Sequence, residues 1–308
     1  MENHANRNID LFAALWKGKW IIVGTTLLFA VLSLIIALSL TNIYRSDALL
    51  APVSSESKIG GGLASLSSQF GGLASMAGIS LGGVQTDKTT LAIEYLRSRT
   101  FLIDFIARHS LKVPIMAAVG WDRESDQLRI GSDIYDQQAN RWVRKVESPK
   151  KPEPSSWEVY EAFLEMIAVE RNSQTGLVSL SVEHYSPTLA KQWVELLVSD
   201  LNAFMANKDK LESENSIQFL QNQISETAIV GMQSVIYGLI EEQLKTKMLA
   251  EVREDYVFSY VDPPLTPEQK FKPKRAVICI VGTFTGGLLG CLSVLLLAIS
   301  KGARKTVV

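Results

Sequence analysis

The sequence predicts an α+β domain that contains a very long helix and is anchored by two transmembrane helices. Two uncharged apolar blocks lie near the ends of the 308-residue chain. Between them, segments with strand-like alternation mix with segments of helical period, and one proline-poor run of helical period exceeds 60 residues. A hydrophobic content of 47% with a net charge of -1 argues against disorder. The two blocks exclude a simple cytosolic enzyme and a multi-span transporter.

The two apolar blocks occupy residues 20–40 and 276–300, and neither contains a charged residue. At about 1.5 Å of rise per residue, a helix over the first block spans roughly 30 Å, the thickness of the hydrocarbon layer of a bilayer. A cleaved signal peptide is the alternative for this block, but apolar regions of signal peptides run to only about 7–15 residues. We therefore predict a membrane-spanning helix in each block.

Basic residues set the expected orientation of these spans. They lie just before the first block and just after the second, at Lys17, Lys19, Lys301, Arg304 and Lys305. The excess of positive charge on cytoplasmic flanks then places the tails 1–19 and 301–308 in the cytoplasm and residues 41–275 on the other side. Four basic residues oppose this orientation, at Lys270, Lys272, Lys274 and Arg275. The rule is weak for long loops, so we keep this topology.

The first part of the region between the spans opens with a strand. Residues 43–53 alternate loosely between apolar and polar side chains. Residues 54–83 are rich in Gly, Ser, Ala and Leu and repeat the sequence GGLAS at 61–65 and 71–75. Glycine doublets disfavour regular structure. Composition alone therefore favours a loop over a segment that packs its small residues against a partner.

The middle of this region alternates helix and strand. Residues 87–109 have apolar spacing near 3.6 and predict one helix, with Asp87 as its cap. Residues 120–151 are polar and predict irregular or extended structure. Ser155 and Glu158 then form a capping box that opens a short helix through residue 166.

A strand pair and a long helical run follow. Residues 167–171 and 177–184 predict two strands joined by a turn that ends at Gly176. A helix starts at Ser186 with a proline in its first turn, and helical spacing continues to about residue 254 with a break expected near Gly231. Helices of this length need packing partners. Another subunit and a helical hairpin within the chain both fit the spacing.

The chain then returns toward the membrane. Residues 256–261 predict a strand. The run Asp-Pro-Pro-Leu-Thr-Pro at 262–267 fits neither strand nor helix. Because proline fixes the backbone in an extended conformation, this run predicts a stiff connector to the second span.

The residues typical of catalysis are scattered. His4, His109 and His184 lie far apart, and the sequence holds no HExxH, GxSxG or phosphate-binding Walker motif. Aromatic side chains that could stack on sugars are more consistent with core positions, at Trp121, Trp142, Trp157 and Tyr160. Residues 41–275 carry 25 basic and 30 acidic residues, which disfavours nucleic acid as a partner. We predict no catalytic residue, no cofactor and no metal.

The second span carries a ridge of glycines. Gly282, Gly286 and Gly290 recur at i, i+4 and i+8, so they lie on one face of a helix. Small residues at this spacing allow another helix to approach closely in lipid. The first span, a neighbouring subunit and another membrane protein all remain candidates for that helix.

The C-terminal motif resembles the polysaccharide co-polymerases, the chain-length determinant (Wzz) proteins of Gram-negative inner membranes. The motif consists of Pro264, Pro267, Pro273, Lys274, Gly286 and Gly290. The family commonly has serine where this chain has Lys272. Three other segments also resemble the family, at residues 71–83, 237–243 and 248–256. For the glycine-rich stretch 71–83, the resemblance favours an ordered or interface role.

The resemblance implies an α+β periplasmic domain with a very long projecting helix, both termini in the cytoplasm, and a homo-oligomeric ring or bell. It implies a protein without enzyme activity. Such a protein sets the modal chain length of lipopolysaccharide O-antigen, or a related surface polysaccharide, that a Wzy-type polymerase builds from lipid-linked units.

Three other functions compete with this one. A capsule or exopolysaccharide export co-polymerase would work with a separate kinase, because the eight-residue tail 301–308 has no room for a kinase domain. A two-span sensor or chemoreceptor needs a cytoplasmic signalling domain. A glycan-processing enzyme of the periplasm needs two carboxylates about 5–10 Å apart.

Overall fold

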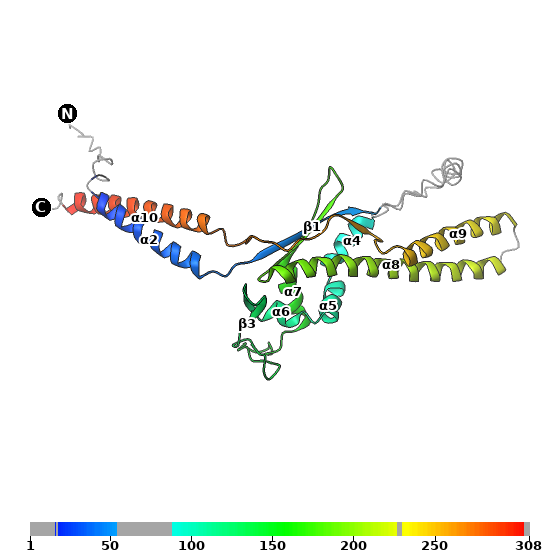
Figure 1. Cartoon of the computed structure of the whole chain (residues 1–308). Helices are drawn as coiled ribbons and strands as arrows, with labels where there is room; N and C mark the ends of the chain where they lie inside the picture. Colours follow the sequence, from blue (N-terminus) through cyan, green and yellow to red (C-terminus); the bar gives the residue numbers. More distant parts are fainter. Residues whose placement is uncertain (1–15, 17, 54–87, 227–229, 305–308) are drawn as a thin grey trace, which may run out of the picture. The chain divides into compact units, whose positions relative to one another are not determined.

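The computed structural model describes residue 16 and residues 18–53, 88–226 and 230–304 (Figure 1). The chain forms two compact units. The membrane unit comprises residues 1–43 and 269–308, and the large unit comprises residues 44–268. The glycine-rich stretch at 54–83 and the predicted cap Asp87 lie outside the described residues.

The membrane unit contains two long apolar helices, which run side by side (Figure 1). They are α2 (Lys19–Ser39) and α10 (Arg275–Arg304). Both are long and apolar enough to cross a membrane. The two helices predicted at 20–40 and 276–300 are therefore confirmed, and α10 continues four residues past the predicted end.

The large unit is built on a four-stranded antiparallel sheet in the order β6-β7-β1-β8. Its strands are β1 (Tyr44–Pro52), β6 (Ile167–Arg171), β7 (Val178–His184) and β8 (Phe258–Asp262). All four strands were expected from the sequence. The turn between β6 and β7 places Gly176 at a φ of 74°, a left-handed conformation that glycine adopts without steric cost.

Two small hairpins lie in the stretch that predicted irregular or extended structure. β2 (Ala118–Asp122) pairs with β3 (Gln127–Ile130), and β4 (Tyr135–Asp136) pairs with β5 (Arg141–Trp142). The hydroxyl of Tyr135 also bonds the side chain of Asn140 across the second turn. The extended interpretation of this stretch is therefore confirmed.

The helix predicted over 87–109 is two helices, so that prediction is wrong in one respect. α4 (Lys88–Arg97) ends before Ser98, α5 (Arg99–Arg108) starts after it, and a short α6 (Lys112–Met116) follows. Ser98 has an extended backbone, and its hydroxyl accepts a hydrogen bond from the N–H of Phe101. A serine that caps the next helix in this way ends the first helix, although the apolar spacing continues across it.

α7 (Ser156–Met166) has the boundaries and the start that its sequence predicts. Ser155 accepts from the N–H of Glu158, and the Glu158 carboxylate accepts from the N–H of Ser155. Both halves of the capping box are present, so two backbone donors at the helix start are satisfied.

The core of the large unit lies between the sheet and the helices α4, α5, α7 and the first half of α8. Its largest fully buried side chains are Trp193, Phe101, Phe105, Phe163 and Phe258. Each such side chain contributes about 1.5–3 kcal/mol by leaving water.

α8 (Pro187–Glu226) has 40 residues, which makes it roughly 60 Å long. The hydroxyl of Ser186 accepts from the N–H of Leu189 and caps its start, as predicted. α9 (Val230–Val252) packs back along its second half (Figure 1). The helix therefore breaks before Gly231, and the hairpin is the alternative that the structure supports.

Candidate functional site

The glycine ridge of α10 faces α2, which answers the question that the sequence left open. A Cβ atom at Gly286 would lie 2.5 Å from the Cβ of Phe29, and one at Gly282 would overlap the Cβ of Ser33. A Cβ at Gly290 would lie 3.0 Å from the backbone Cα of Ile22. Because backbone cannot move aside as a side chain can, the three glycines are what allow the two helices to approach.

Two further glycines lie at or near the contact between the two helices. Gly287 lies off the ridge, because a Cβ there would meet only the hydroxyl of Thr26, at 3.6 Å. Gly18, which the sequence did not single out, lies against Val294. The polar side chains along the contact bond their own helix: Thr25 donates to Ile21 O at 3.0 Å. The hydroxyls of Thr26, Ser33 and Thr283 likewise donate to carbonyls of their own helix, which gives them partners inside lipid.

The predicted motif residues divide between the two units. Pro264 and Pro267 belong to the large unit, whereas Pro273, Lys274 and the glycines belong to the membrane unit. Pro264 is buried, and the hydroxyl of Ser46 in β1 donates to the carbonyl of Leu265 at 2.8 Å. Residues 263–267 form neither helix nor strand, as their composition predicts, and the segment is bonded to the sheet near its start.

The ends of the two spans are tied together. The N–H of Ile43 donates to Lys272 O at 3.0 Å, and the N–H of Phe271 donates to Ile43 O at 2.8 Å. The guanidinium of Arg275 donates to Asn42 Oδ1 at 3.1 Å. These contacts hold residues 271–275 at the place where α2 ends and α10 begins.

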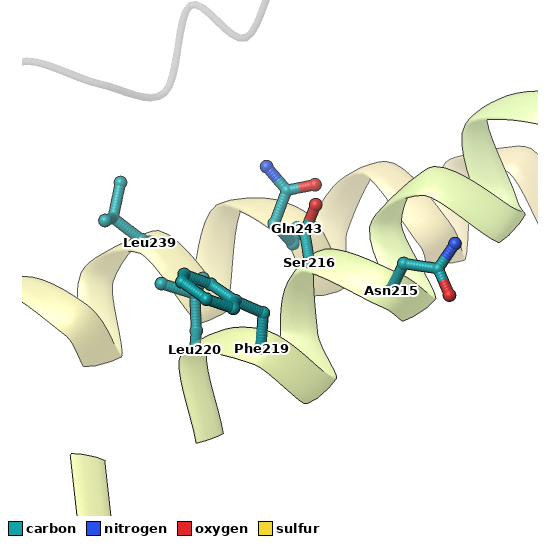
Figure 2. Close-up of a pocket in the computed structure, with 6 residues that line it drawn as sticks. All are labelled: Asn215, Ser216, Phe219, Leu220, Leu239 and Gln243. Atoms are coloured by element: carbon teal, nitrogen blue, oxygen red, sulfur yellow. The ribbon is translucent and has the colours of Figure 1, made fainter. Parts of the chain in front are cut away.

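The α8–α9 hairpin presents a large apolar surface. Its exposed side chains are Leu211, Phe219, Val235, Leu239, Leu244, Met248 and Val252. A shallow groove of about 440 Å³ lies between the helices, with Phe219 and Leu220 from α8 beside Leu239 from α9 (Figure 2). Ser216, Asn215 and Gln243 complete its lining. Exposed apolar side chains around such a groove are typical of an interaction site.

Ion pairs hold the two helices of the hairpin together. Lys210 and Glu251 approach to 2.9 Å, and Lys247 and Glu214 approach to 3.0 Å. The hydrogen bond from Lys210 lowers the pKa of Glu251, and the same bond raises the pKa of Lys210. Exposed pairs contribute little stability each, so their effect is to fix how the helices align.

A polar cluster fixes the base of the hairpin. The carboxylate of Asp209 in α8 accepts from Lys88 Nζ and from the hydroxyl of Tyr256, both at 2.6 Å. Burial raises the pKa of Tyr256, and the Asp209 charge raises it further. The cluster therefore joins the starts of α4 and β8 to the middle of α8.

The histidines occupy separate structural positions. His109 Nε2 lies 2.8 Å from Asp200 Oδ2, which ties α5 to α8. His184 is buried beside Trp193 and bonds the backbone of Ser186 and Pro114. In the part of the chain that the structure describes, no three His, Cys, Asp or Glu residues lie close enough to hold a metal ion.

Among the aromatic residues that could bind sugars, Trp157 and Tyr160 contact each other, whereas Trp121 and Trp142 contact other rings. Trp142 packs on Tyr135, and Trp121 packs edge-on against Tyr44. Trp157 is 48% exposed and lies under the guanidinium of Arg99, so the core position expected for it is wrong. Its place on the exposed side of α7 depends on tertiary packing, for which the sequence offers no signal.

Comparisons with known proteins relate the chain to one family. Residues 9–109, about a third of the chain, match the family model described as "Wzz: Chain length determinant protein". No curated protein matches the sequence.

Two solved structures are similar to the chain at low identity. A "full-length bacterial polysaccharide co-polymerase" is 13% identical, with a TM-score of 0.38 and coverage of 97% of this chain and 98% of that one. A fragment of WzzB, a polysaccharide co-polymerase from Salmonella Typhimurium, is 11% identical, with a TM-score of 0.30 and coverage of 75% and 100%. The resemblance to the chain-length determinant (Wzz) family that the sequence motifs predict is confirmed by the family model over residues 9–109.

Proposed function

We propose that the chain is a non-enzymatic regulator of the modal chain length of a surface polysaccharide, lipopolysaccharide O-antigen or a related glycan. The family match over residues 9–109 is the observation that carries this proposal. The proline and glycine motif at 264–290 supports it independently, because it lies in a different part of the sequence.

In this proposal the protein sits in the inner membrane of a Gram-negative cell, with residues 1–19 and 301–308 in the cytoplasm and residues 41–275 in the periplasm. Aromatic and basic side chains at the start of α2 support a membrane boundary there. Trp16 is 70% exposed and Trp20 is 78% exposed, and Lys19 Nζ lies 5.4 Å from the Trp16 ring. Tryptophan and lysine are typical of the level of the lipid head groups.

We also propose that the protein works as a homo-oligomeric ring or bell, with the α8–α9 hairpin as a contact between copies. The hairpin leaves Phe219 and Val235 each 63% exposed, although both are large apolar side chains. A second copy would cover this surface. Its pairing with a neighbour would also answer the expectation that so long a helix needs partners.

The partner of this scaffold is a Wzy-type polymerase that acts on lipid-linked glycan units. The described residues favour a scaffold role, in which the protein holds its partners, over a role in bond cleavage. The two described histidines bond groups of the chain itself, His109 with Asp200 and His184 with Ser186. Length control would then arise from where the scaffold places the polymerase or the growing glycan.

A gel ladder of surface lipopolysaccharide tests the function. We expect a deletion strain to lose the clustered long chains and to show an unregulated distribution, and complementation to restore the clusters. An unchanged ladder would contradict O-antigen control. Loss of capsule or exopolysaccharide in that same strain, together with dependence on a separate kinase, would instead identify an export co-polymerase.

A further inference from the structure

The basic residues that oppose the predicted orientation form a defined cluster at the outer end of the two spans. Lys270, Lys272, Lys274 and Arg275 lie within six consecutive residues. Exposure alternates along this stretch: the three lysines are exposed, whereas Phe271 and Pro273 are half-buried. The stretch therefore presents its ammonium groups outward from a backbone that packs on the membrane unit.

The cluster is held in place by the protein. The backbone of Lys272 exchanges hydrogen bonds with Ile43, at 3.0 Å and 3.2 Å. Arg275 Nη2 donates to Leu40 O at 3.4 Å and to Asn42 Oδ1 at 3.1 Å. The Nε of Arg275 has no hydrogen-bond partner. The positive charges are thus fixed where α2 ends and α10 begins.

The two spans and the described residues that flank them carry no acidic side chain, and the acidic residue nearest to the cluster in the sequence is Glu268 of the large unit. Residues 18–43 and 269–304 contain no aspartate and no glutamate. The N-terminus of α10 at Arg275 adds a further partial positive charge, because the dipoles of a helix point their positive end at its start. Four cations and a helix start therefore lie together in a part of the unit that has no negative side chain.

Such a cluster opposes the proposed orientation of the spans, because basic flanks favour the cytoplasmic side. Negative charge from outside the unit offsets that cost. Phosphate groups lie at the level of the bilayer where a span ends, and lysine and arginine bind them through charge-assisted hydrogen bonds. We propose that Lys270, Lys272, Lys274 and Arg275 bind phosphate groups of membrane lipids in the leaflet that faces residues 41–275.

The proposal rests on the membrane topology proposed above, but its test is independent of polysaccharide length. The phosphate could be carried by an anionic phospholipid or by a polyprenyl carrier lipid, since both present the same group at the same depth. A site that made only uncharged contacts would bind anionic phosphatidylglycerol and zwitterionic phosphatidylcholine equally well. A cationic cluster favours the lipid whose phosphate has no compensating positive charge.

The test uses the full chain in a neutral detergent and counts bound lipids by native mass spectrometry. The probes are phosphatidylglycerol, phosphatidylcholine and polyprenyl phosphate. The test variant is K270Q/K272Q/K274Q. The control, R123Q/K145Q/K151Q, removes the same charge from three exposed residues of the large unit. A third variant, K270R/K272R/K274R, keeps the charge and the hydrogen-bond donors.

Each basic residue near an anionic lipid surface changes the affinity about fivefold, so loss of three lysines should weaken binding roughly 100-fold. We expect this loss in the glutamine variant, and wild-type binding in the control and in the arginine variant. Weakening for both anionic lipids supports a general phosphate site, and weakening for one alone identifies the carrier of the phosphate. Equal binding of both anionic lipids by the test and control variants, at equal melting temperature, would overturn the proposal.

Discussion

The side chain of Asn202 in α8 closes a hydrogen-bonded ring with the backbone of Phe258 in β8. Its Nδ2 donates to Phe258 O at 2.8 Å, and its Oδ1 accepts from the N–H of Phe258 at 3.0 Å. Oδ1 also accepts from the N–H of Val257 at 2.9 Å. β8 is an edge strand of the sheet, so this amide satisfies backbone groups that lack a neighbouring strand and fixes the long helix to the sheet.

Replacement of Asn202 by alanine should destabilise the large unit strongly. Three buried backbone groups would lose their partner, and each unsatisfied buried group costs about 1–3 kcal/mol. We expect the free energy of unfolding to fall by about 3 kcal/mol or more, measured by thermal melting of the full chain in detergent. Asn207→Ala is the control, because Asn207 lies on the same helix and is exposed. Equal melting temperatures for the two variants would show that the ring contributes little.

Gly286→Leu should separate α10 from α2. The new side chain would collide with Phe29, and the Thr25 carbonyl would lie 3.1 Å from its Cβ. If modal-length control depends on this helix pair, the variant should show an unregulated polysaccharide ladder. Gly287→Leu adds the same side chain where a Cβ meets only Thr26, and it should retain a normal ladder. A normal ladder for Gly286→Leu, at normal protein level, would refute the prediction.

Phe219→Asp should weaken association between copies of the chain. Phe219 is 63% exposed on the hairpin surface that we assign to a neighbouring copy, and a buried unpaired charge there is costly. Light scattering of the detergent-solubilised chain should show a smaller particle. Gln221→Asp, which adds a charge at another exposed position of α8, should leave the size unchanged. A full-size particle for Phe219→Asp would remove the hairpin from the interface.

The elements that the sequence predicts well are those with local signals. The capping box at Ser155 needs only residues three apart, and the spans need only a long uncharged run. The strands around Gly176 likewise follow from alternation and a turn residue. Each of these signals lies within a few residues of the element that it predicts.

What the sequence does not predict depends on contacts between distant residues. Ser98 ends one helix and caps another, yet its neighbours keep a continuous apolar period. The glycine ridge is visible in the sequence, but its partner Phe29 lies about 250 residues away, and no local pattern joins the two. Asn202 likewise resembles any polar residue of a helix until β8 is placed against it.

Glu158 should make the stability of the large unit depend on acid. The guanidinium of Arg144, which donates to its carboxylate at 2.7 Å, and the N–H of Ser155 lower its pKa from 4.5 to about 2. Because the folded pKa is the lower one, the stabilisation is present above pH 4.5 and is lost as the pH falls toward 2. Thermal melting of Glu158→Gln should show a lower melting temperature at neutral pH and a flatter profile below pH 4.5.

The matched control for this change is Glu161→Gln, one turn further along α7 at an exposed position. It should keep the acid dependence of the parent protein. If Glu158→Gln loses stability between pH 4.5 and 2 as steeply as the parent, the ion pair with Arg144 does not determine the acid response.

His184 should make the stability of the large unit depend on pH in a second, less acidic range. It is 2% exposed, and burial lowers its pKa from 6.5 to about 4, although the bond to the Pro114 carbonyl favours the charged form. Its Nδ1 accepts from the N–H of Ser186 at 3.1 Å, which requires a neutral ring at that nitrogen. Between pH 6.5 and 4 the unfolded chain therefore binds a proton that the folded chain excludes. As the pH is lowered through this range, the free energy of unfolding falls by on the order of 3 kcal/mol.

His184→Asn tests this assignment. The amide oxygen of asparagine can accept from the Ser186 N–H as Nδ1 does, but it does not titrate. We expect a lower melting temperature at pH 7.5, because the imidazole ring, whose centroid lies 4.6 Å from that of the Trp193 ring, is lost. Between pH 6.5 and 4 the melting temperature of the variant should change much less than that of the parent. A variant with the parent's slope in this range would mean that other groups cause it, and that His184 keeps an ordinary proton affinity in the folded protein.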